Sequence, residues 1–164
     1  MINKQNLASN YTLTRKLTLS GLVMALYIII MYYTQSFSFG QYQIRLATSL
    51  YSLSYIFPFL ILPLGLSNML SNILMGGFGI PDMLGGLAVG IITSTSIYLI
   101  KKFNLNEWLI AIPIIIFPGL VVPIWLSFFL KLPYSVLAVS ITIGQIIPSI
   151  IGILLIKRFK KVFR

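Results

Sequence analysis

Cysteine and histidine are absent from this sequence, and only two of its 164 residues are acidic. Without cysteine the chain forms no disulfide, no thiolate metal site and no cysteine nucleophile. Without histidine it lacks the usual general base and the commonest metal ligand. Because Asp82 and Glu107 are its only carboxylates, we expect a protein that is not an enzyme and that needs neither a metal nor another cofactor.

Charge of either sign is scarce. Charged residues make up 9% of the chain and hydrophobic residues 58%, with a mean hydropathy of +0.97. A soluble domain is about 25% charged, so these few charges do not cover the surface of a water-soluble protein of this size. Since a spanning helix needs about 20 residues, the sequence predicts an all-α integral membrane protein. It has room for five or six spans and for no separate soluble domain.

Six apolar segments are candidate spans. They run from about Leu17 to Tyr33, Leu46 to Phe57, Pro58 to Met75, Met83 to Ile100, Trp108 to Leu130 and Tyr134 to Ile156. Little but Pro58 separates the second segment from the third, and Pro63 interrupts the third. This pair is therefore either two short helices or one long kinked helix.

The basic residues favour an even number of spans. With the N-terminus inside, the cytoplasmic segments hold ten of the twelve basic residues: Lys4, Arg15, Lys16, Lys101, Lys102, Lys157, Arg158, Lys160, Lys161 and Arg164. The outer side keeps Arg45 and Lys131, as the positive-inside rule requires. We therefore predict one six-helix transmembrane domain over residues 17–156. A cytoplasmic segment, 1–16, precedes it without a cleaved signal peptide, and a basic cytoplasmic tail, 157–164, binds anionic lipid headgroups.

Polar residues gather toward the predicted outer half. The loop after the first span and the segments that follow contribute Gln41, Gln43, Arg45, Asn68, Asn72 and Asp82, and Gln145 lies at middle depth in the last span. Asn68 and Asn72 are spaced i and i+4 and so share one helix face. Together these side chains predict a polar pocket for a small solute, because polar groups at membrane depth are costly unless they have a use.

Each of these residues also has a simpler interpretation. The two asparagines are suited to hydrogen bonds with a neighbouring helix. Asp82 is placed where it would cap a helix, and Arg45 where it would snorkel to the interface. In the first span, Gly21 and Ala25 form a small-xxx-small pair. Such a pair lets another helix approach closely, either within the bundle or from a partner membrane protein.

These motifs, in this order, resemble the QueT-type substrate-binding (S) components of energy-coupling factor (ECF) transporters. The matching residues are FGQYQIRL around Arg45, Pro58 and Pro63, GLSNMLSN (Gly65–Asn72), Asp82, GGLA (Gly85–Ala88), and LPY (Leu132–Tyr134) followed by Gly144. The resemblance covers most of the chain from about Ser20 onward. It implies a six-helix bundle that binds a vitamin-like solute, here a queuosine precursor (a deazaguanine base, or the queuosine base or nucleoside), in a pocket open to the outside.

The resemblance also implies partners. Such proteins dock through their first helices on a transmembrane coupling protein that carries two cytoplasmic ATPase subunits, in the plasma membrane of a prokaryote. Gly21 and Ala25 fall where the family uses small residues for docking. The sequence itself has no GxxxxGK[ST] nucleotide motif, as expected if the ATPases are separate chains.

Two positions depart from the family pattern. Where members have a glutamate three residues after the arginine, this chain has Thr48, and the usual glycine–glutamate pair of the last helix is here Gly144–Gln145. We include Thr48 and Gln145 in the expected site. Because they replace two glutamates of the family pattern, the chain could instead be an S component for another vitamin-like molecule. A stand-alone secondary transporter is a further alternative. An intramembrane enzyme is the weakest, for want of histidine, cysteine and paired carboxylates.

Overall fold

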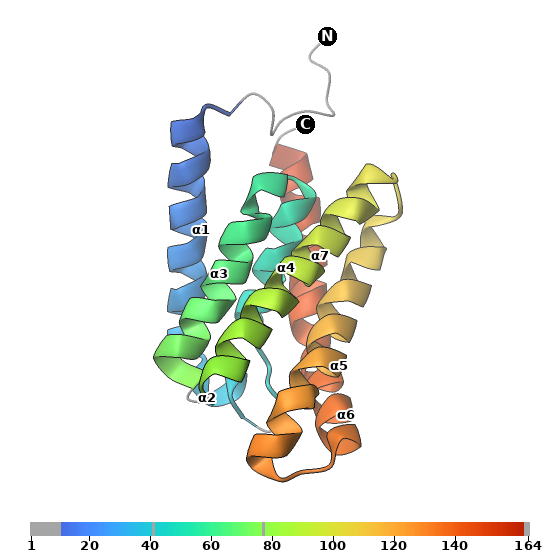
Figure 1. Cartoon of the computed structure of the whole chain (residues 1–164). Coiled ribbons are helices and arrows are strands. Elements are labelled where there is room, and N and C mark those ends of the chain that lie inside the picture. The colour runs from blue at the N-terminus through green and yellow to red at the C-terminus, as the bar shows by residue number, and fades with distance from the viewer. Residues whose placement is uncertain (1–10, 41, 77, 163–164) are drawn as a thin grey trace.

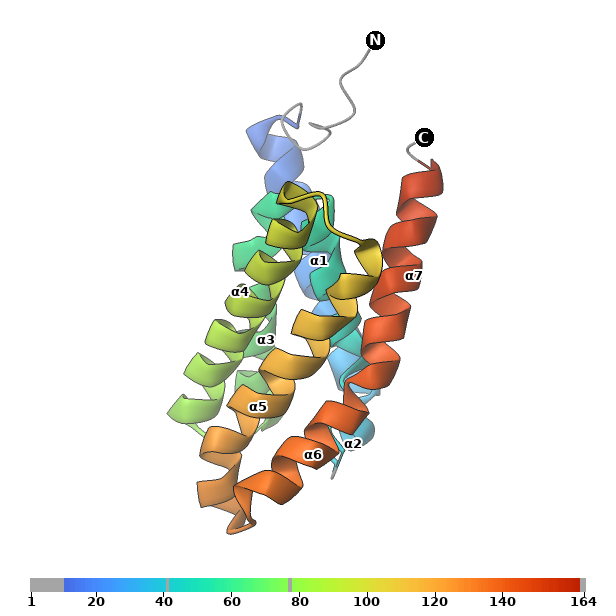
Figure 2. The same cartoon turned by 90° about the vertical axis from the view of Figure 1, so that its right-hand side faces the viewer.

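The computed structural model describes residues 11–40, 42–76 and 78–162. In these ranges all regular structure is helical and there is no strand. The helices lie side by side along one axis (Figures 1 and 2). Their bounds are α1 (Leu13–Tyr33), α2 (Gln35–Ser38), η2 (Leu46–Tyr55), η3 (Pro58–Leu60), α3 (Ile61–Ser71), η4 (Asn72–Gly76), α4 (Ile80–Lys102), η5 (Glu107–Ile110), α5 (Ala111–Leu130), α6 (Tyr134–Gly144) and α7 (Ile146–Val162).

Five helical segments of the described chain are long and apolar enough to cross a membrane. They are Leu13–Tyr33, Pro58–Gly76, Ile80–Lys102, Glu107–Leu130 and Tyr134–Lys161. Each corresponds to one of the predicted spans. The segments Leu13–Tyr33, Ile80–Lys102 and Tyr134–Lys161 are several residues longer than the matching predictions, because residues outside the predicted apolar runs are also helical. The prediction of an all-α membrane protein is therefore confirmed.

The predicted second span, Leu46 to Phe57, differs from the rest. Its residues 46–55 form the ten-residue 3₁₀-helix η2, which runs through the middle of the bundle and whose side chains are nearly all buried. At about 2.0 Å per residue, ten residues cover about 20 Å, short of the ~30 Å of a bilayer core. Hydroxyl groups favour this tight winding, since Thr48, Ser49 and Ser54 each donate to the carbonyl three residues back at 2.7 Å.

The predicted last span, Tyr134 to Ile156, is broken in the middle. The helix α6 ends at Gly144 and α7 begins at Ile146, with Gln145 between them. The break coincides with a close approach of the loop before η2, since a Cβ on Gly144 would lie 1.8 Å from the carbonyl oxygen of Tyr42. Only glycine fits there, so the loop is held against the junction of the two helices.

The helices α3 and α4 pack backbone to backbone. A Cβ on Gly90 would lie 2.7 Å from the Cα of Gly65, closer than any side chain permits. Such glycine contacts let polar groups of one membrane helix reach the backbone of the next. The main apolar core lies beside this contact, around Tyr27, Tyr51 and Leu64.

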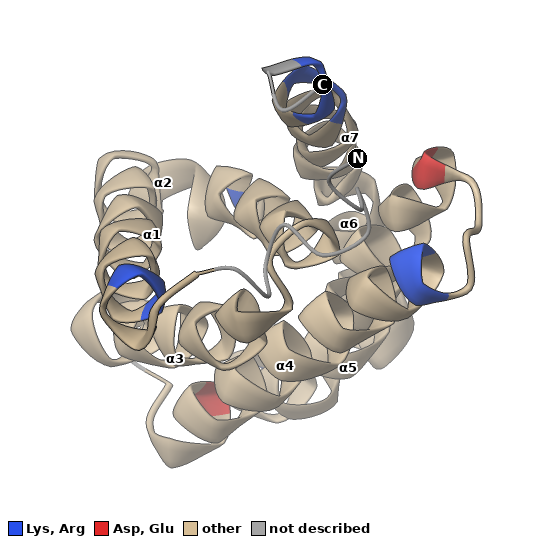
Figure 3. Ribbon diagram, turned by 90° about the horizontal axis from the view of Figure 1, so that it is seen from above, with Lys and Arg blue, Asp and Glu red and all other residues tan. Residues whose placement is uncertain are grey.

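The charges divide between the two ends of the bundle. The helix α1 begins, and α4 and α7 end, at one end (Figure 1), and Figure 3 shows the lysines and arginines grouped at these helix ends. We call this the basic end; its described basic residues are Arg15, Lys16, Lys101, Lys102, Lys157, Arg158, Lys160 and Lys161. Glu107 pairs with Lys160 there. Arg45 and Lys131 belong to the opposite end, which we call the Arg45 end.

Candidate functional site

The guanidinium group of Arg45 is buried at the entrance to η2, with 5% of the residue exposed. Its Nη1 donates to Oδ1 of Asn68 at 3.1 Å and to Oδ1 of Asn72 at 3.2 Å. Its Nε donates to the backbone oxygen of Ser38 at 3.4 Å. Arg45 is therefore no snorkelling anchor, because its charge is held inside the protein by carboxamide and carbonyl oxygens.

The two asparagines join Arg45 to α4. The Nδ2 of Asn68 donates to the backbone oxygen of Gly86 at 2.9 Å, and the Nδ2 of Asn72 donates to that of Asp82 at 2.8 Å. Each carboxamide thus uses its nitrogen on the neighbouring helix and turns its oxygen toward the guanidinium. The interhelical interpretation and the pocket interpretation of this pair are both compatible with this geometry.

Asp82 lies in the first turn of α4 but does not cap it. The N-cap residue is Gly79, which has a φ of 73°, so the capping interpretation of Asp82 was wrong. The carboxylate is buried, with 2% of the residue exposed. Its Oδ1 accepts from Nε1 of Trp125 at 3.1 Å, and its Oδ2 has no hydrogen-bond partner within the described part of the chain.

The aromatic ring of Phe39 lies close to both charges. The Cζ of Arg45 is 4.8 Å from the centre of the Phe39 ring, a cation–π distance. A Cβ on Gly76 would lie 3.4 Å from the edge of that ring and 2.5 Å from Oδ2 of Asp82. Among the described residues Arg45 and Asp82 form no ion pair. The site therefore holds one cation and one anion that do not pair with each other, and Phe39 lies close to both.

A second polar group adjoins the first. The Thr48 hydroxyl lies 2.8 Å from Oε1 of Gln145 and 2.7 Å from the backbone oxygen of Arg45, two acceptors that share its one proton. The Nε2 of Gln145, which is fully buried, donates to the backbone oxygen of Gln43 at 3.0 Å. The two positions that depart from the family pattern thus contact each other, and both are neutral.

The structure places the predicted residues in two adjoining groups. Arg45, Asn68, Asn72 and Asp82 make the first, and Gln43, Thr48 and Gln145 the second, while Gln41 lies outside the described residues. The contributions of Trp125, Gly76 and Phe39 were not predicted. No spacing rule relates Trp125 to a carboxylate 43 residues away, although a tryptophan inside a span that needs an N–H acceptor was a usable signal.

The small pair of α1 faces outward. Gly21 and Ala25 are exposed, and no atom lies within 4 Å of a Cβ built on Gly21. The interpretation that they pack inside the bundle was therefore wrong. Toward the basic end the same face is continued by Thr14 and Thr18, which line a hollow of about 370 Å³ beside Phe57.

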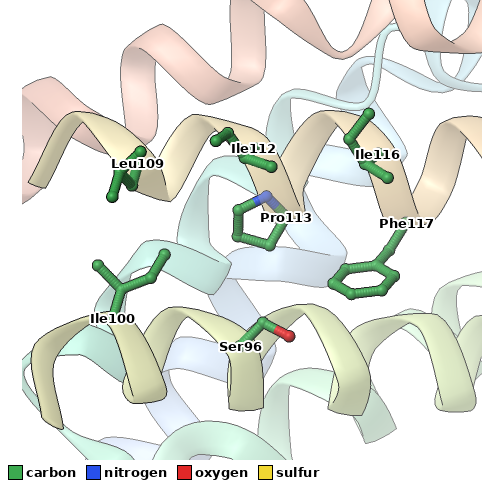
Figure 4. A pocket seen from close by; sticks show the side chains of 7 residues that line it. All are labelled: Ser96, Ile100, Leu109, Ile112, Pro113, Ile116 and Phe117. Carbon is green, nitrogen blue, oxygen red and sulfur yellow. The ribbon is translucent and has the colours of Figure 1, made fainter. Parts of the chain in front are cut away.

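One apolar groove of the bundle lies away from this site. Figure 4 shows this groove of about 290 Å³ between α4 and α5, toward the basic end, in which the Ser96 hydroxyl is the one polar side-chain group. Its lining residues are Ser96, Ile100, Leu109, Ile112, Pro113, Ile116 and Phe117. This groove has almost no polar side chains, unlike the group of buried polar side chains at the Arg45 end.

The chemistry available at the Arg45 end is that of binding. It offers one guanidinium, one carboxylate, carboxamides and aromatic rings, and no cluster of metal-ligating side chains occurs in the described chain. A helical membrane bundle with such a site fits a membrane transport protein. A family model described as "QueT transporter" matches residues 17–161, nearly the whole chain. The chain belongs to the QueT transporter family, while no curated protein and no solved structure matches it.

We predict that Thr48 and Gln145 are energetically coupled. Thr48→Val alone leaves the buried Oε1 of Gln145 without its donor, and Gln145→Leu alone leaves the backbone oxygen of Gln43 without its donor, so each should lower the free energy of unfolding by about 1–3 kcal/mol. The double variant should lose less than the sum by about 1 kcal/mol. Denaturant unfolding of the detergent-solubilised protein measures this. The exposed matched control, Thr18→Val, should change it by less than about 0.5 kcal/mol, and additive losses would contradict the coupling.

Proposed function

We propose that this chain is the substrate-binding (S) component of an ATP-driven ECF importer, and that its solute is a queuosine precursor. The observation that carries the proposal is the buried pair of opposite charges, Arg45 and Asp82, held apart at one end of a membrane bundle. Burying two charges that do not neutralise each other directly is expensive. A ligand that contacts both gives this arrangement a use.

The proposed orientation follows the charges. Because basic residues are retained on the cytoplasmic side, the basic end faces the cytoplasm and the Arg45 end faces outward, in the plasma membrane of a prokaryote. The five long helices and η2 then make six crossings in one domain, 17–156. The last helix continues through Lys157–Lys161 into the basic tail, and both termini are cytoplasmic.

The proposed solute is a deazaguanine base, or the queuosine base or nucleoside. Such a base offers a carbonyl oxygen and N–H groups on one edge, which suit a guanidinium donor and a carboxylate acceptor. With Thr48 and Gln145 neutral, Asp82 is the one carboxylate among the described site residues. The site carries one charge of each sign and so favours a solute whose contacted edge is uncharged.

The proposed partners are a transmembrane coupling protein and two ATPase subunits. The sequence carries no nucleotide-binding motif of its own. The exposed face of α1 with Gly21 and Ala25 offers a flat surface on which another membrane helix can pack closely. This exposed face favours the hypothesis of a docked S component over that of a stand-alone transporter. An S component for another vitamin-like solute is the alternative that the neutral Thr48 and Gln145 favour.

Asp82→Asn and Asn72→Ala should each weaken solute binding about 10- to 100-fold while expression is retained. Each removes a hydrogen bond that involves a charged group or orients one, which is worth about 1.5–3 kcal/mol. Calorimetry with a deazaguanine base measures the dissociation constant. The matched control is Glu107→Gln, which removes the other carboxylate, at the basic end, and should bind as the unaltered chain does. Normal binding by both site variants would place the solute elsewhere.

Gly21→Leu and Ala25→Leu should impair assembly with the coupling protein and leave solute binding intact. A leucine on this face keeps two helix backbones from approaching. Copurification of the coupling protein with the tagged chain measures assembly. Ala88→Leu places the same side chain at an exposed position of α4 and should assemble normally. Unchanged assembly of both α1 variants would remove this face from the docking surface.

A further inference from the structure

The two oxygens of the Asp82 carboxylate have different surroundings. Oδ1 accepts from the indole N–H of Trp125 at 3.1 Å. Oδ2 is buried and has no donor among the described residues. A buried carboxylate oxygen without a donor is costly, and native proteins seldom keep one without a reason. Among the described residues this atom is therefore the site acceptor that has no donor and is available to a bound molecule.

Trp125 fixes the direction of this carboxylate. A Cβ on Gly85 would lie 2.5–2.7 Å from three atoms of the indole ring. The six-membered part of the ring thus lies directly on the backbone of α4, three residues after Asp82. With the ring locked there, its N–H holds Oδ1, and the position of Oδ2 follows.

Gly76 provides the space for Oδ2. A Cβ on this residue would lie 2.5 Å from the oxygen, so any side chain there displaces the carboxylate. Gly76 ends the π-helical turn η4, whose first residue, Asn72, also contacts Arg45 and the backbone of Asp82. Local π-helical geometry is frequent at functional sites.

Arg45, which lies over the Phe39 ring, has donor capacity left. Its Nη1 and Nε are used by asparagine and backbone oxygens, while Nη2 has no hydrogen-bond partner in the described part of the chain. A guanidinium carries five N–H donors and accepts nothing. The site thus presents unused donors on Arg45 and an unused acceptor on Asp82.

We infer that Oδ2 of Asp82 accepts an N–H group of the solute, and that Trp125 and Gly76 are the positioning residues that hold it for this purpose. The solute class that follows is an uncharged heterocycle whose edge carries an N–H donor beside a carbonyl acceptor. The inference rests on the proposed function and sharpens it, because it names the edge that is read and the residues that set selectivity.

The test compares two probes by calorimetry on the detergent-solubilised chain. Deazaguanine has a carbonyl acceptor and N–H donors on the relevant edge, and deazaadenine has a ring-nitrogen acceptor where deazaguanine has an N–H. The unaltered chain should prefer deazaguanine by at least about tenfold, since a site built for a donor rejects a ligand that lacks it. Asp82→Asn, Trp125→Phe and Gly76→Ala should each reduce the preference to about threefold or less.

Trp125→Phe keeps an aromatic ring on Gly85 and removes the N–H, and Trp108→Phe, at the exposed tryptophan of the basic end, is its matched control. The control should retain the full preference. The chain has two tryptophans, so in the Trp108→Phe protein Trp125 alone fluoresces. Its emission should change when deazaguanine binds, a response that a purely structural tryptophan would not give.

The possible results distinguish a wrong solute class from a wrong role for Oδ2 of Asp82. If neither probe binds, the proposed solute class is wrong and this assignment falls with it. If both bind equally well, base binding stands and the role of Oδ2 is overturned. If Asp82→Asn abolishes the preference but Trp125→Phe and Gly76→Ala keep it, the positioning roles of Trp125 and Gly76 are overturned. The same conclusion follows if the fluorescence emission of Trp125 does not change when deazaguanine binds. The two positioning variants act from different helices, so a folding defect in one leaves the other informative.

Discussion

The burial of the Arg45 guanidinium is the constraint on which the Arg45 end depends. Removing this charge from water costs several kcal/mol unless its hydrogen bonds are replaced. The replacement comes from Asn68 and Asn72, whose oxygens reach the guanidinium because their nitrogens are held by the backbone of α4. This requires α3 and α4 to be almost in contact, which the glycine pair Gly65 and Gly90 permits. The buried charge, the two asparagines and the two glycines therefore depend on one another.

The two ends of the bundle carry different electrostatics. At the basic end the described chain has eight basic side chains and the one carboxylate of Glu107, so this end suits an anionic lipid surface. Within the buried site at the Arg45 end the charges balance one to one, because Arg45 is its one cation and Asp82 its one anion. The neutral Thr48–Gln145 pair keeps that balance. A balanced site is suited to a neutral polar solute, and its selectivity then rests on hydrogen-bond direction.

Hydropathy and charge placement were enough to predict the membrane class and five of the helices, and the predicted site residues Arg45, Asn68 and Asn72 lie in contact in the structure. What the sequence did not reveal depends on contacts between distant segments. The break at Gln145 coincides with the approach of a loop to Gly144, and the 3₁₀ winding of η2 coincides with hydroxyl groups that bond carbonyls three residues back. Trp125 reaches Asp82 from another helix. The domain limits at 16 and 157 and the solute remain predictions, and Gln41 lies outside the described residues.

Uptake of a labelled deazaguanine base by proteoliposomes tests the central claim most directly, because it separates binding from pumping. Vesicles are prepared with the chain alone, with the chain and its coupling protein and ATPase subunits, and with the full set lacking ATP. The account predicts that the chain alone binds the base stoichiometrically without accumulating it, and that accumulation needs the partners and ATP. Accumulation by the chain alone, driven by an ion gradient, would contradict the account and identify a secondary transporter.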